Sequence, residues 1–587
     1  MAAGSLTNPR IAAAMEELGD LYELDGVDQY RVIAYRNAAR SIRDATQSVQ
    51  ALVEAGRATE LKGIGKTLDE KLRALLETGD IPAAVKLRAK IPVGLISVMH
   101  LPGFGPRRAR RLFDELGVDS LESLKAAAEA GEVRKLRGFG PKVETALLEM
   151  LAAGHDGRPE PRVLLTRALP LAEQIVAALR SIDPDPPEHV AVAGSLRRLA
   201  DSVKDIDIIA TARNPKALVA ALAELPIIAE AGAPGDNALR AMTHTGMRVD
   251  VRVVEPDQFG NVLQHLSGSK AHNVALREAA VRAGMHVSEY GIKIDETGET
   301  VRCATEEEVY ATLGYDWIPP ELREGRGELE AARHGGPGLP DLVTVEDLKG
   351  DLHMHTTLSD GRDSVEQMAQ AAIERGYGYI AITDHSASHG FGNNVTTEQL
   401  WAQVEHVRAV NAQLDGFELL IGTESNINLD GSPDYPDDLL AELDWVIASV
   451  HTSFGMPEKE MTARMVHAME HPWVDAIGHP TGRKIETRPP YAVDVDKLIE
   501  AAASTGTMLE INSAGDRRDL NDVHARAAAE AGVPILIDSD AHGVNTLGIV
   551  RWGVATARRA WLTADQVANA RPWPEFAALR KRSRAKT

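Results

Sequence analysis

Two histidines separated by one residue, His353 and His355, close the segment DLHMH at residues 351–355. Side chains two positions apart on a β-strand point to the same face, so both imidazoles would project side by side from the end of one strand. Such a pair is either a polar strand end in solvent or part of a metal site. The rest of the chain has to decide between these interpretations.

Similar apolar runs between residues 348 and 560 also end in candidate metal ligands. The further runs YIAITDH, ELLIGTE, WVIASVH, WVDAIGH and PILIDSDAH alternate with helical segments. This alternation predicts a parallel sheet that closes into a barrel, where functional groups gather at the carboxyl ends of the strands. With one loop residue added, the candidate ligands are His353, His355, Asp360, His385, Glu424, His451, His479, Asp540 and His542. Strand ends have no structural need to repeat such residues, so the array indicates a metal centre.

The donor types limit the metal and the reaction. Imidazole and carboxylate ligands without a thiolate suit Mn²⁺, Zn²⁺ or Fe²⁺ rather than Ca²⁺. Glu424 or Asp540 would bridge two ions about 3.5–4 Å apart, a spacing that suits hydrolysis of phosphate esters, and we expect roughly two to three ions in all. The residues expected to act in catalysis are His353, His355, Glu424 and Asp540. Arg483, in the sequence HPTGR, would either bind substrate phosphate or form a structural ion pair.

The nine ligand positions and their order resemble the polymerase-and-histidinol-phosphatase (PHP) family over residues 343–575. The resemblance implies a distorted seven-stranded (β/α) barrel with a trinuclear metal centre. All nine ligand positions are filled here. Asn426 stands where the family usually has an acidic residue.

A second carboxylate cluster is predicted from the segment at residues 189–211, HVAVAGSLRRLADSVKDIDIIAT. Asp205 and Asp207 again lie two apart on a strand, and Asp250 lies in another strand, RVDVRVV. Three carboxylates on adjacent strands need cations to stay ionised together, which favours a site for two Mg²⁺ ions. Two such ions would activate a 3′-hydroxyl and stabilise leaving pyrophosphate. Gly194, Ser195, Arg197 and Arg198, just before the pair, are suited to bind a triphosphate.

Residues 1–320 resemble a family X DNA polymerase. By this resemblance Asp205, Asp207 and Asp250 bind Mg²⁺ or Mn²⁺, and Gly194, Ser195 and Arg198 bind a deoxynucleoside triphosphate. The segment HLSGSKAHNVALR matches the thumb of that family and places Gly268, Asn273 and Arg277 near the nascent base pair. Lys71 falls where lyase-active members keep a Schiff-base lysine, although a solvated helix lysine is the alternative. Three departures from the family lie beside the nucleotide: Leu199 and Lys204 replace glycines, and His265 with Leu266 replaces a Tyr-Phe pair.

Three segments of the form L-x-G-x-G precede helical stretches in the first 150 residues: LKGIG, LPGFG and LRGFG. Glycines allow a tight hairpin between two helices, and the N-terminus of the second helix offers backbone N–H groups to phosphate. The repeats resemble the helix-hairpin-helix motif, which binds the DNA backbone without reading sequence. The residues assigned to DNA binding are Gly63, Gly65, Gly103, Gly105, Arg107, Arg108, Gly138 and Gly140.

These patterns predict a multidomain chain. The expected parts are an all-α lyase-like domain with a helix-hairpin-helix (1–80), fingers with two more such motifs (81–155), an α/β nucleotidyltransferase palm (156–255), a thumb (256–322), a Gly/Pro/charge-rich linker (323–342), the PHP metal-dependent phosphoesterase domain (343–575) and a basic tail (576–587). The whole chain resembles a bacterial family X polymerase with 3′–5′ exonuclease activity.

Bulk composition excludes some classes and leaves others open. One cysteine among 587 residues excludes a disulfide scaffold and a Cys-rich zinc site. The sequence has no 18-residue apolar run and no signal-peptide pattern, so we expect a cytoplasmic protein. The net charge of −22 does not exclude DNA, because residues 1–150 carry 22 Lys and Arg against 21 Asp and Glu.

Three functions are weighed. The leading one is a monomeric DNA-repair enzyme, active in base excision repair, that binds gapped, nicked or 3′-damaged DNA. It would trim 3′ ends in the barrel and add nucleotides in the palm. The second keeps the nuclease and treats the palm as a degenerate docking module. The third, a small-molecule phosphatase of histidinol-phosphate type, would have no use for three DNA-binding hairpins.

Overall fold

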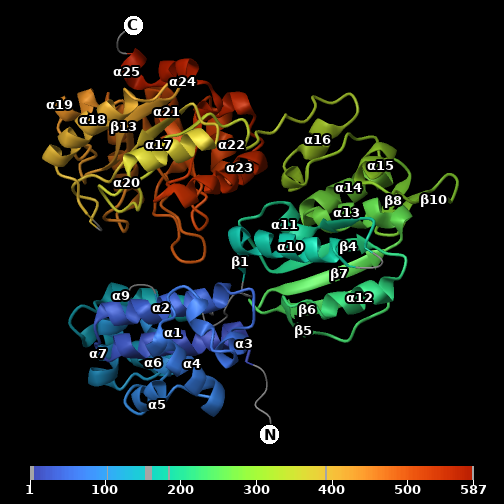
Figure 1. The fold of residues 1–587 in the computed structure, drawn as a ribbon, viewed down its shortest axis with the longest axis horizontal. Helices are drawn as coiled ribbons and strands as arrows, with labels where there is room; N and C mark the ends of the chain where they lie inside the picture. The colour runs from blue at the N-terminus through green and yellow to red at the C-terminus, as the bar shows by residue number, and fades with distance from the viewer. Residues whose placement is uncertain (1–5, 102–103, 153–161, 183–185, 391–392, 585–587) are drawn as a thin grey trace. The chain divides into compact units, whose positions relative to one another are not determined.

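The computed structural model describes residues 6–101, 104–152, 162–182, 186–390 and 393–584 (Figure 1). The chain forms two compact units, each described here by itself. The first comprises Met1–Val163, Arg167–Val192 and Val203–Phe259, and the second comprises Leu164–Thr166, Ala193–Ser202 and Gly260–Thr587. Among the described residues, no helix combines the length and the apolar character needed to cross a membrane.

The N-terminal part of the first unit is helical, as the sequence predicts. Its helices are α1 (Asn8–Leu24), α2 (Gln29–Asp44), α3 (Val49–Glu54), α4 (Lys66–Thr78), α5 (Pro82–Arg88), α6 (Gly94–Met99), α7 (Gly105–Leu116), α8 (Leu121–Glu129) and α9 (Pro141–Ala152). Each L-x-G-x-G segment leads into a helix, namely α4, α7 or α9. The turns need glycine, because Gly63, Gly105 and Gly138 have φ angles of +82°, +61° and +90°.

The rest of the first unit contains a mixed five-stranded sheet in the order β2-β4-β7-β6-β5. Its strands are β2 (Val190–Val192), β4 (Asp205–Thr211), β5 (Ile228–Ala231), β6 (Ala238–Thr243) and β7 (Arg248–Val254), and α12 (Pro215–Ala223) follows β4. Strands β4 and β7 pair in parallel, whereas the other neighbours pair antiparallel. Ile208 and Val251 are buried in this sheet, so burial fixes which side chains face outward.

The second unit begins with short pieces of the palm and the thumb. Helix α10 (Leu165–Arg180) starts in it, α11 (Gly194–Arg197) follows, and the thumb contains α13 (Phe259–Ser267), α14 (Lys270–Arg282), α15 (Glu306–Thr312) and the antiparallel strands β8 (Met285–Ser288), β9 (Gly291–Ile294) and β10 (Thr300–Val301). Ser269 caps α14, and Thr305 forms a capping box on α15. These caps satisfy backbone N–H groups that a helix start leaves unpaired.

The stretch at residues 323–342, which the sequence predicts to be a linker, packs against the thumb. Arg323 is fully buried and forms hydrogen bonds with both carboxylate oxygens of Glu306. Residues Glu328–Ala332 form helix α16, and Glu328 is buried against His272, with Oε1 2.7 Å from Nδ1. The prediction of a linker was wrong for this stretch, because its charged residues have buried partners in the thumb.

Seven parallel strands form the last sheet, in chain order. They are β11 (Gly350–Asp351), β12 (Tyr379–Ile382), β13 (Glu418–Asn426), β14 (Trp445–Ser449), β15 (Ala476–Ile477), β16 (Met508–Asn512) and β17 (Ile535–Asp538). A parallel bridge between Met354 and Ala541 joins the first strand to the last, and Leu352 N–H donates to Asp538 Oδ1 at 2.8 Å. The sheet therefore closes into the predicted seven-stranded barrel.

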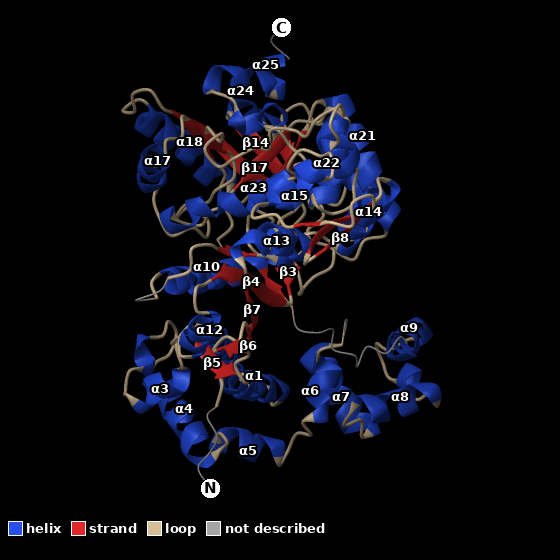
Figure 2. Ribbon diagram, turned by 90° about the vertical axis from the view of Figure 1, so that its right-hand side faces the viewer, coloured by secondary structure: helices blue, strands red, loops and turns tan. Residues whose placement is uncertain are grey.

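Helices surround these strands (Figure 2). They are α17 (Val365–Glu374), α18 (Thr397–Asn411), α19 (Asp437–Glu442), α20 (Glu458–Glu470), α21 (Val495–Thr505), α22 (Asp522–Glu530) and α23 (Val550–Arg559). Ser364 and Thr396 start α17 and α18 with capping boxes. The strands are short apolar runs buried on both faces, as parallel strands covered by helices should be.

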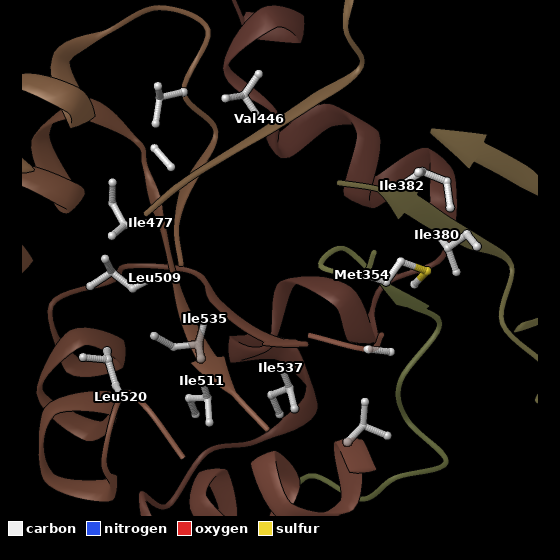
Figure 3. Packing of buried hydrophobic residues seen from close by; sticks show 14 of the residues in the cluster. Met354, Ile380, Ile382, Val446, Ile477, Leu509, Ile511, Leu520, Ile535 and Ile537 are labelled. Carbon is white, nitrogen blue, oxygen red and sulfur yellow. The ribbon is translucent and has the colours of Figure 1, made fainter. Parts of the chain in front are cut away.

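Side chains alternate along the strands between two apolar clusters. Ile380, Ile477, Ile511 and Ile537 belong to the larger cluster, together with residues of the helices (Figure 3). The side chains at the alternate strand positions belong to the smaller cluster, which includes Trp445 and has members on six of the strands. Burying one such side chain contributes about 1.5–3 kcal/mol, so the barrel has a well-filled frame on which to hold polar groups.

The predicted basic tail is also part of this frame. Helices α24 (Trp573–Leu579) and α25 (Lys581–Arg584) follow the barrel, and Phe576 is fully buried in the smaller cluster. Arg582 donates to Asp475 at 2.9 Å. The boundary predicted at residue 576 was therefore wrong for the described residues up to 584. At the start of the barrel, Asn569 donates to Gly350 O at 2.9 Å and accepts from Lys349 N–H at 2.8 Å.

Candidate functional site

Nine predicted ligands meet at the carboxyl ends of the barrel strands. His353 and His355 follow β11, His385 follows β12, Glu424 lies in β13, His451 follows β14, His479 follows β15, and Asp540 and His542 follow β17, while Asp360 lies in the loop after β11. Side chains of this set form three groups whose candidate ligand atoms lie within 4.8 Å of one another. The clustering predicted from the sequence is thus present.

Glu424 is the centre of the arrangement. Its Oε1 lies 3.1 Å from His451 Nε2 and 3.0 Å from His479 Nε2. Its Oε2 lies 2.7 Å from His385 Nδ1 and 3.4 Å from His353 Nε2. One carboxylate that faces imidazoles on both oxygens has the geometry of a bridging ligand.

Asp540 and Asp360 hold the other two sides of the site. Asp540 Oδ1 lies 3.1 Å from His355 Nε2. Asp360 lies 3.6 Å from His385 Nε2 and 3.2 Å from His542 Nε2. Burial lowers the pKa of His542, but the hydrogen bond with Asp360 and the charges of Asp540 and Asp360 together outweigh it and raise that pKa to about 9. These pairs and the Glu424 group account for all nine predicted positions.

Two of the nine candidate ligands have a strained backbone. Asp540 has a φ of +54° and His479 a φ of +29°, in the region that favours glycine. Residues held in that region cost about 1–3 kcal/mol each and cluster at functional sites. The barrel frame therefore holds these two ligands against a local preference.

The surroundings set the protonation of the ligands. Burial disfavours the charged form of Glu424, but His451 and His353 outweigh it and hold the pKa of its carboxyl well below the usual range. Burial lowers the pKa of His355 and of His479 to about 3. His355 and His479 are therefore neutral and Glu424 is ionised, which is the form in which these side chains bind metal ions. Burial also lowers the pKa of His353, but the charges of Glu424 and Glu510 outweigh it and raise that pKa.

The residues fit a metal centre on two further observations. His353 Nε2 and His355 Nδ1 are buried and make no hydrogen bond to any residue that the structure describes. Buried polar atoms of this kind normally have partners. The donors are imidazoles and carboxylates with no thiolate, because Cys303, the single cysteine, is buried in the thumb cluster.

Sequence reasoning missed a residue on β16, the one strand without a predicted ligand. Glu510 is buried, and its Oε1 lies 2.7 Å from His353 Nδ1 while its Oε2 accepts from His479 N–H at 2.5 Å. Two residues on, Asn512 donates to Asp540 Oδ2 at 3.0 Å. Such outer partners fix the orientation and tautomer of a ligand. The strand alternation of MLEIN was the available signal, since Glu510 and Asn512 share a face.

Two other residues near the predicted ligands have structural partners. Asp384 accepts hydrogen bonds from Thr356 and Ser359 and so fixes the loop after β11. Arg483 is paired with Asp201 at 2.9 Å and donates to the carbonyl of Arg518. This is the ion pair that the sequence left open as the alternative to phosphate binding.

The three predicted palm carboxylates lie together on two paired strands of the first unit. Asp207 on β4 is the direct register partner of Asp250 on β7, and Asp205 lies two residues before Asp207. Arg240 donates to Asp250 at 3.1 Å. Asp205 and Asp250 line a hollow of about 550 Å³. A cluster of adjacent carboxylates open to a hollow is suited to bind divalent cations.

The predicted triphosphate loop lies in the second unit. Gly194 has a φ of +67° and Ser195 lies in α11. The side chain of Arg198 is bonded to Glu324 at 3.0 Å and to the carbonyl of Ser267 at 3.1 Å. Leu199 adopts a φ of +56°, the backbone region in which the expected glycine would be unstrained.

The thumb residues form their own network. A Cβ at Gly268 would meet Asn273 Oδ1 at 2.3 Å, so glycine is needed at this turn. Asn273 donates to the carbonyl of His265 at 2.8 Å, and Arg277 lies 3.1 Å from His265 Nδ1. His265 thus contacts two of the residues predicted to lie near the base pair.

The predicted DNA-binding residues lie at the hairpin turns, except that Gly103 is outside the described residues. Gly65 and Gly140 directly precede α4 and α9, and Arg107 and Arg108 are exposed on α7. Lys71 is partly buried on α4. Burial raises the pKa of Tyr22, and the positive charge of Lys71 offsets part of that rise.

Comparison with known proteins identifies the family of this chain. It is 38% identical over 578 residues, 98% of this chain and 99% of the relative, to a protein of Bacillus subtilis (strain 168) named "DNA polymerase/3'-5' exonuclease PolX". The chain belongs to the PolX family. Three family profiles match its parts: the helix-hairpin-helix domain at residues 6–81, the DNA polymerase beta thumb at residues 262–324 and the PHP domain at residues 351–514. The predicted resemblance to a family X polymerase with a PHP domain is confirmed.

Other relatives match only a part of this chain. A probable phosphatase of Thermoanaerobacter sp. (strain X514) is 30% identical over 236 residues, 37% of this chain and 89% of the relative. A probable phosphatase of Caldanaerobacter subterraneus subsp. tengcongensis is 32% identical over 203 residues, 33% of this chain and 75% of the relative. About a third of the chain is therefore similar to most of the length of much shorter proteins.

Proposed function

We propose that this chain is a DNA-repair enzyme of base excision repair that acts as a monomer on gapped, nicked or 3′-damaged DNA. The barrel hydrolyses phosphodiester bonds at 3′ ends, and the palm adds nucleotides from deoxynucleoside triphosphates. The observation that carries the proposal is the convergence of nine imidazole and carboxylate side chains on one rim of the barrel.

The proposed barrel cofactor is Mn²⁺, Zn²⁺ or Fe²⁺, with roughly two to three ions held by the nine ligands. When bound, such ions supply Lewis acidity to a phosphoryl oxygen and lower the pKa of water. Glu424 orders the site because it faces four imidazoles. Glu510 holds the ring of His353 from behind. The predicted catalytic residues His353, His355, Glu424 and Asp540 all lie within this network.

Arg517 is the cation best placed to meet a phosphate at the barrel site. Its Nε lies 3.9 Å from Asp540 Oδ2, and its side chain is mostly buried. Because Arg483 is already paired with Asp201, a phosphate-binding role for Arg483 would require that pair to open.

The proposed palm site binds Mg²⁺ or Mn²⁺ through Asp205, Asp207 and Asp250. The register of β4 and β7 supports it. Gly194, Ser195 and Arg198 would bind the triphosphate, and Gly268, Asn273 and Arg277 would lie near the base pair. Nucleotide addition is expected to be slow for two reasons. The backbone of Leu199 is strained, and Lys204, the residue before Asp205, has an exposed side chain.

The helical part is proposed to bind the DNA backbone at the hairpins containing Gly63 and Gly65, Gly103 and Gly105, and Gly138 and Gly140. Exposed Arg107 and Arg108 support this role. Lys71 remains the candidate for a lyase step on a 5′ end.

The decisive experiment uses gapped DNA labelled near its 3′ end, with and without nucleotides, in Mn²⁺ and in Mg²⁺. Replacing His353 and His355 with alanine removes two ligands and should abolish 3′-end trimming while nucleotide addition continues. Replacing Asp205 and Asp207 with alanine should do the reverse. His406→Ala is the matched control, because His406 is an exposed histidine on α18.

Elemental analysis of the same proteins measures their metal content independently of their activity. Wild type and the His406 variant should carry Mn, Zn or Fe, and the His353/His355 variant should carry less. If the His353/His355 variant trims DNA at the wild-type rate, the barrel is not the nuclease.

A further inference from the structure

The segment Gly194–Asp201 has a backbone conformation that its own sequence does not favour. Gly194 adopts φ +67° at little cost, but Leu199 adopts φ +56° with a branched side chain. A residue other than glycine is disfavoured in this conformation, because its Cβ crowds the following carbonyl oxygen. The segment therefore needs contacts from elsewhere to keep it, and its neighbours in the second unit supply them.

Arg518, in the loop after β16, is the first of these contacts. It is fully buried, and two of its side-chain nitrogens donate hydrogen bonds while the third lies at ion-pair distance from a carboxylate. Nη2 donates to the carbonyl of Leu199 at 3.1 Å, Nη1 lies 3.1 Å from Asp201 Oδ1, and Nε donates to Thr556 Oγ1 at 2.8 Å. A buried guanidinium with this many partners has one orientation, so it fixes the backbone that it holds.

Arg559, the last residue of α23, is the second contact. Its Nη1 donates to the carbonyl of Arg198 at 2.8 Å and to Glu324 Oε1 at 2.8 Å. Its Nη2 lies 2.9 Å from Asp522 Oδ2. Glu324 also accepts from Arg198 Nε at 3.0 Å, so one arginine of the barrel restrains both the main chain and the side chain of Arg198.

We propose that Arg518 and Arg559 are positioning residues that hold Gly194–Asp201 in the form that binds a nucleoside triphosphate. The inference rests on the proposed nucleotidyl transfer, in which this segment receives the triphosphate. It goes further by making nucleotide affinity depend on the PHP barrel. The strained leucine at position 199 gives the physical reason, because the two arginines offset a cost that a glycine would not incur.

The test centres on Arg559→Met in the full-length chain. Arg559 contacts none of the nine ligands, whereas Arg518 is next to Arg517, which lies near Asp540. Arg551→Met is the matched control, because Arg551 is exposed on the same helix and stacks on Trp552 at 4.1 Å. Asp201→Asn forms a second arm that removes the negative charge paired with Arg518 and Arg483 without changing size.

Two measurements are made on each protein. Amide hydrogen exchange of residues 194–201 without nucleotide should quicken about tenfold in Arg559→Met and in Asp201→Asn, and not in Arg551→Met. The dissociation constant of a Mg²⁺–deoxynucleoside triphosphate should rise about tenfold in the same two variants. Hydrolysis of 3′ ends by Arg559→Met should stay at the wild-type rate. Arg559→Lys, which keeps one donor, should recover part of the affinity.

The outcomes separate this inference from the proposed function. If exchange and nucleotide affinity in Arg559→Met match those of Arg551→Met, the positioning role is overturned even though wild type binds nucleotide. If wild type itself binds no nucleotide, the proposed function of the palm fails, and the role for nucleotide binding falls with it. Faster exchange without any loss of affinity also overturns the inference, because the segment would then not need to be held.

Discussion

At the scale of single residues, the candidate metal centre also depends on side chains that orient the predicted ligands without being predicted ligands themselves. The sequence predicted the nine candidate ligands because eight of them end apolar runs and Asp360 lies in the loop after the first run. It did not predict Glu510, whose strand MLEIN reads as another buried run with one acid in it. Its partner His353 lies 157 positions earlier in the chain, and no local pattern reports a contact over that separation.

Replacing Glu510 with glutamine tests its role. The amide keeps the size but loses the charge that orients His353, and partners of this kind typically change metal affinity by about 10–100-fold. We expect Glu510→Gln to retain less metal in a chelator titration and to trim 3′ ends more slowly. Glu500→Gln, at an exposed position on α21, is the control. Equal metal retention in both variants would contradict the assignment.

At the scale of elements, composition was a poor guide wherever charges are paired at long range. The stretch at 323–342 is rich in Gly, Pro and charge and reads as a linker, and the basic end reads as a frayed tail. Arg323 is nevertheless buried against Glu306, and Arg582 against Asp475. Helices and strands were predictable from the spacing of apolar residues along the chain. These two ion pairs were not, because each joins residues that are separated in the sequence.

The Glu306 cluster predicts a pH dependence of stability. Burial raises the pKa of Glu306, but Arg323 and Arg197 outweigh it and lower that pKa from 4.5 to about 2. Since the folded pKa lies below the unfolded value, the stabilisation is complete above pH 4.5 and is lost as pH falls towards 2. The loss should reach about 3 kcal/mol.

Hydrogen exchange of the amides of α15 measures this effect. In wild type the opening free energy should fall between pH 4.5 and 2. Glu306→Gln should open more easily at pH 7, since it leaves Arg323 buried without its charge partner, and should depend less on pH. Glu307→Gln, exposed on the same helix, should behave like wild type. A wild-type profile that is flat in this range would refute the prediction.

At the scale of the whole molecule, charge is divided unevenly between the helical part and the rest. Residues 1–150 are nearly neutral while the chain carries −22, so the remainder is strongly acidic. DNA approaching such a chain would be attracted where basic side chains are exposed, as on α7. The helix-hairpin-helix, thumb and PHP matches were predictable because each of these parts has its own motifs.

Charge reversal on α7 tests where the DNA backbone is held. Arg107→Glu with Arg108→Glu should weaken binding to gapped DNA of any sequence and flatten its salt dependence by about two units of slope. Lys86→Glu with Lys90→Glu is the control, because it makes the same charge change at exposed positions outside the hairpins. A loss confined to certain sequences, or an unchanged slope, would exclude a phosphate contact.

The hydrogen bonds of Asn569 have a consequence for how such a chain can arise. They tie Asn569, in the segment between α23 and α24, to Lys349 and Gly350 at the first strand. The two ends of the barrel domain therefore lie close together. A module with this property can be joined to unrelated neighbours through a single attachment point, and gene fusion can move it between proteins without opening the ring of strands.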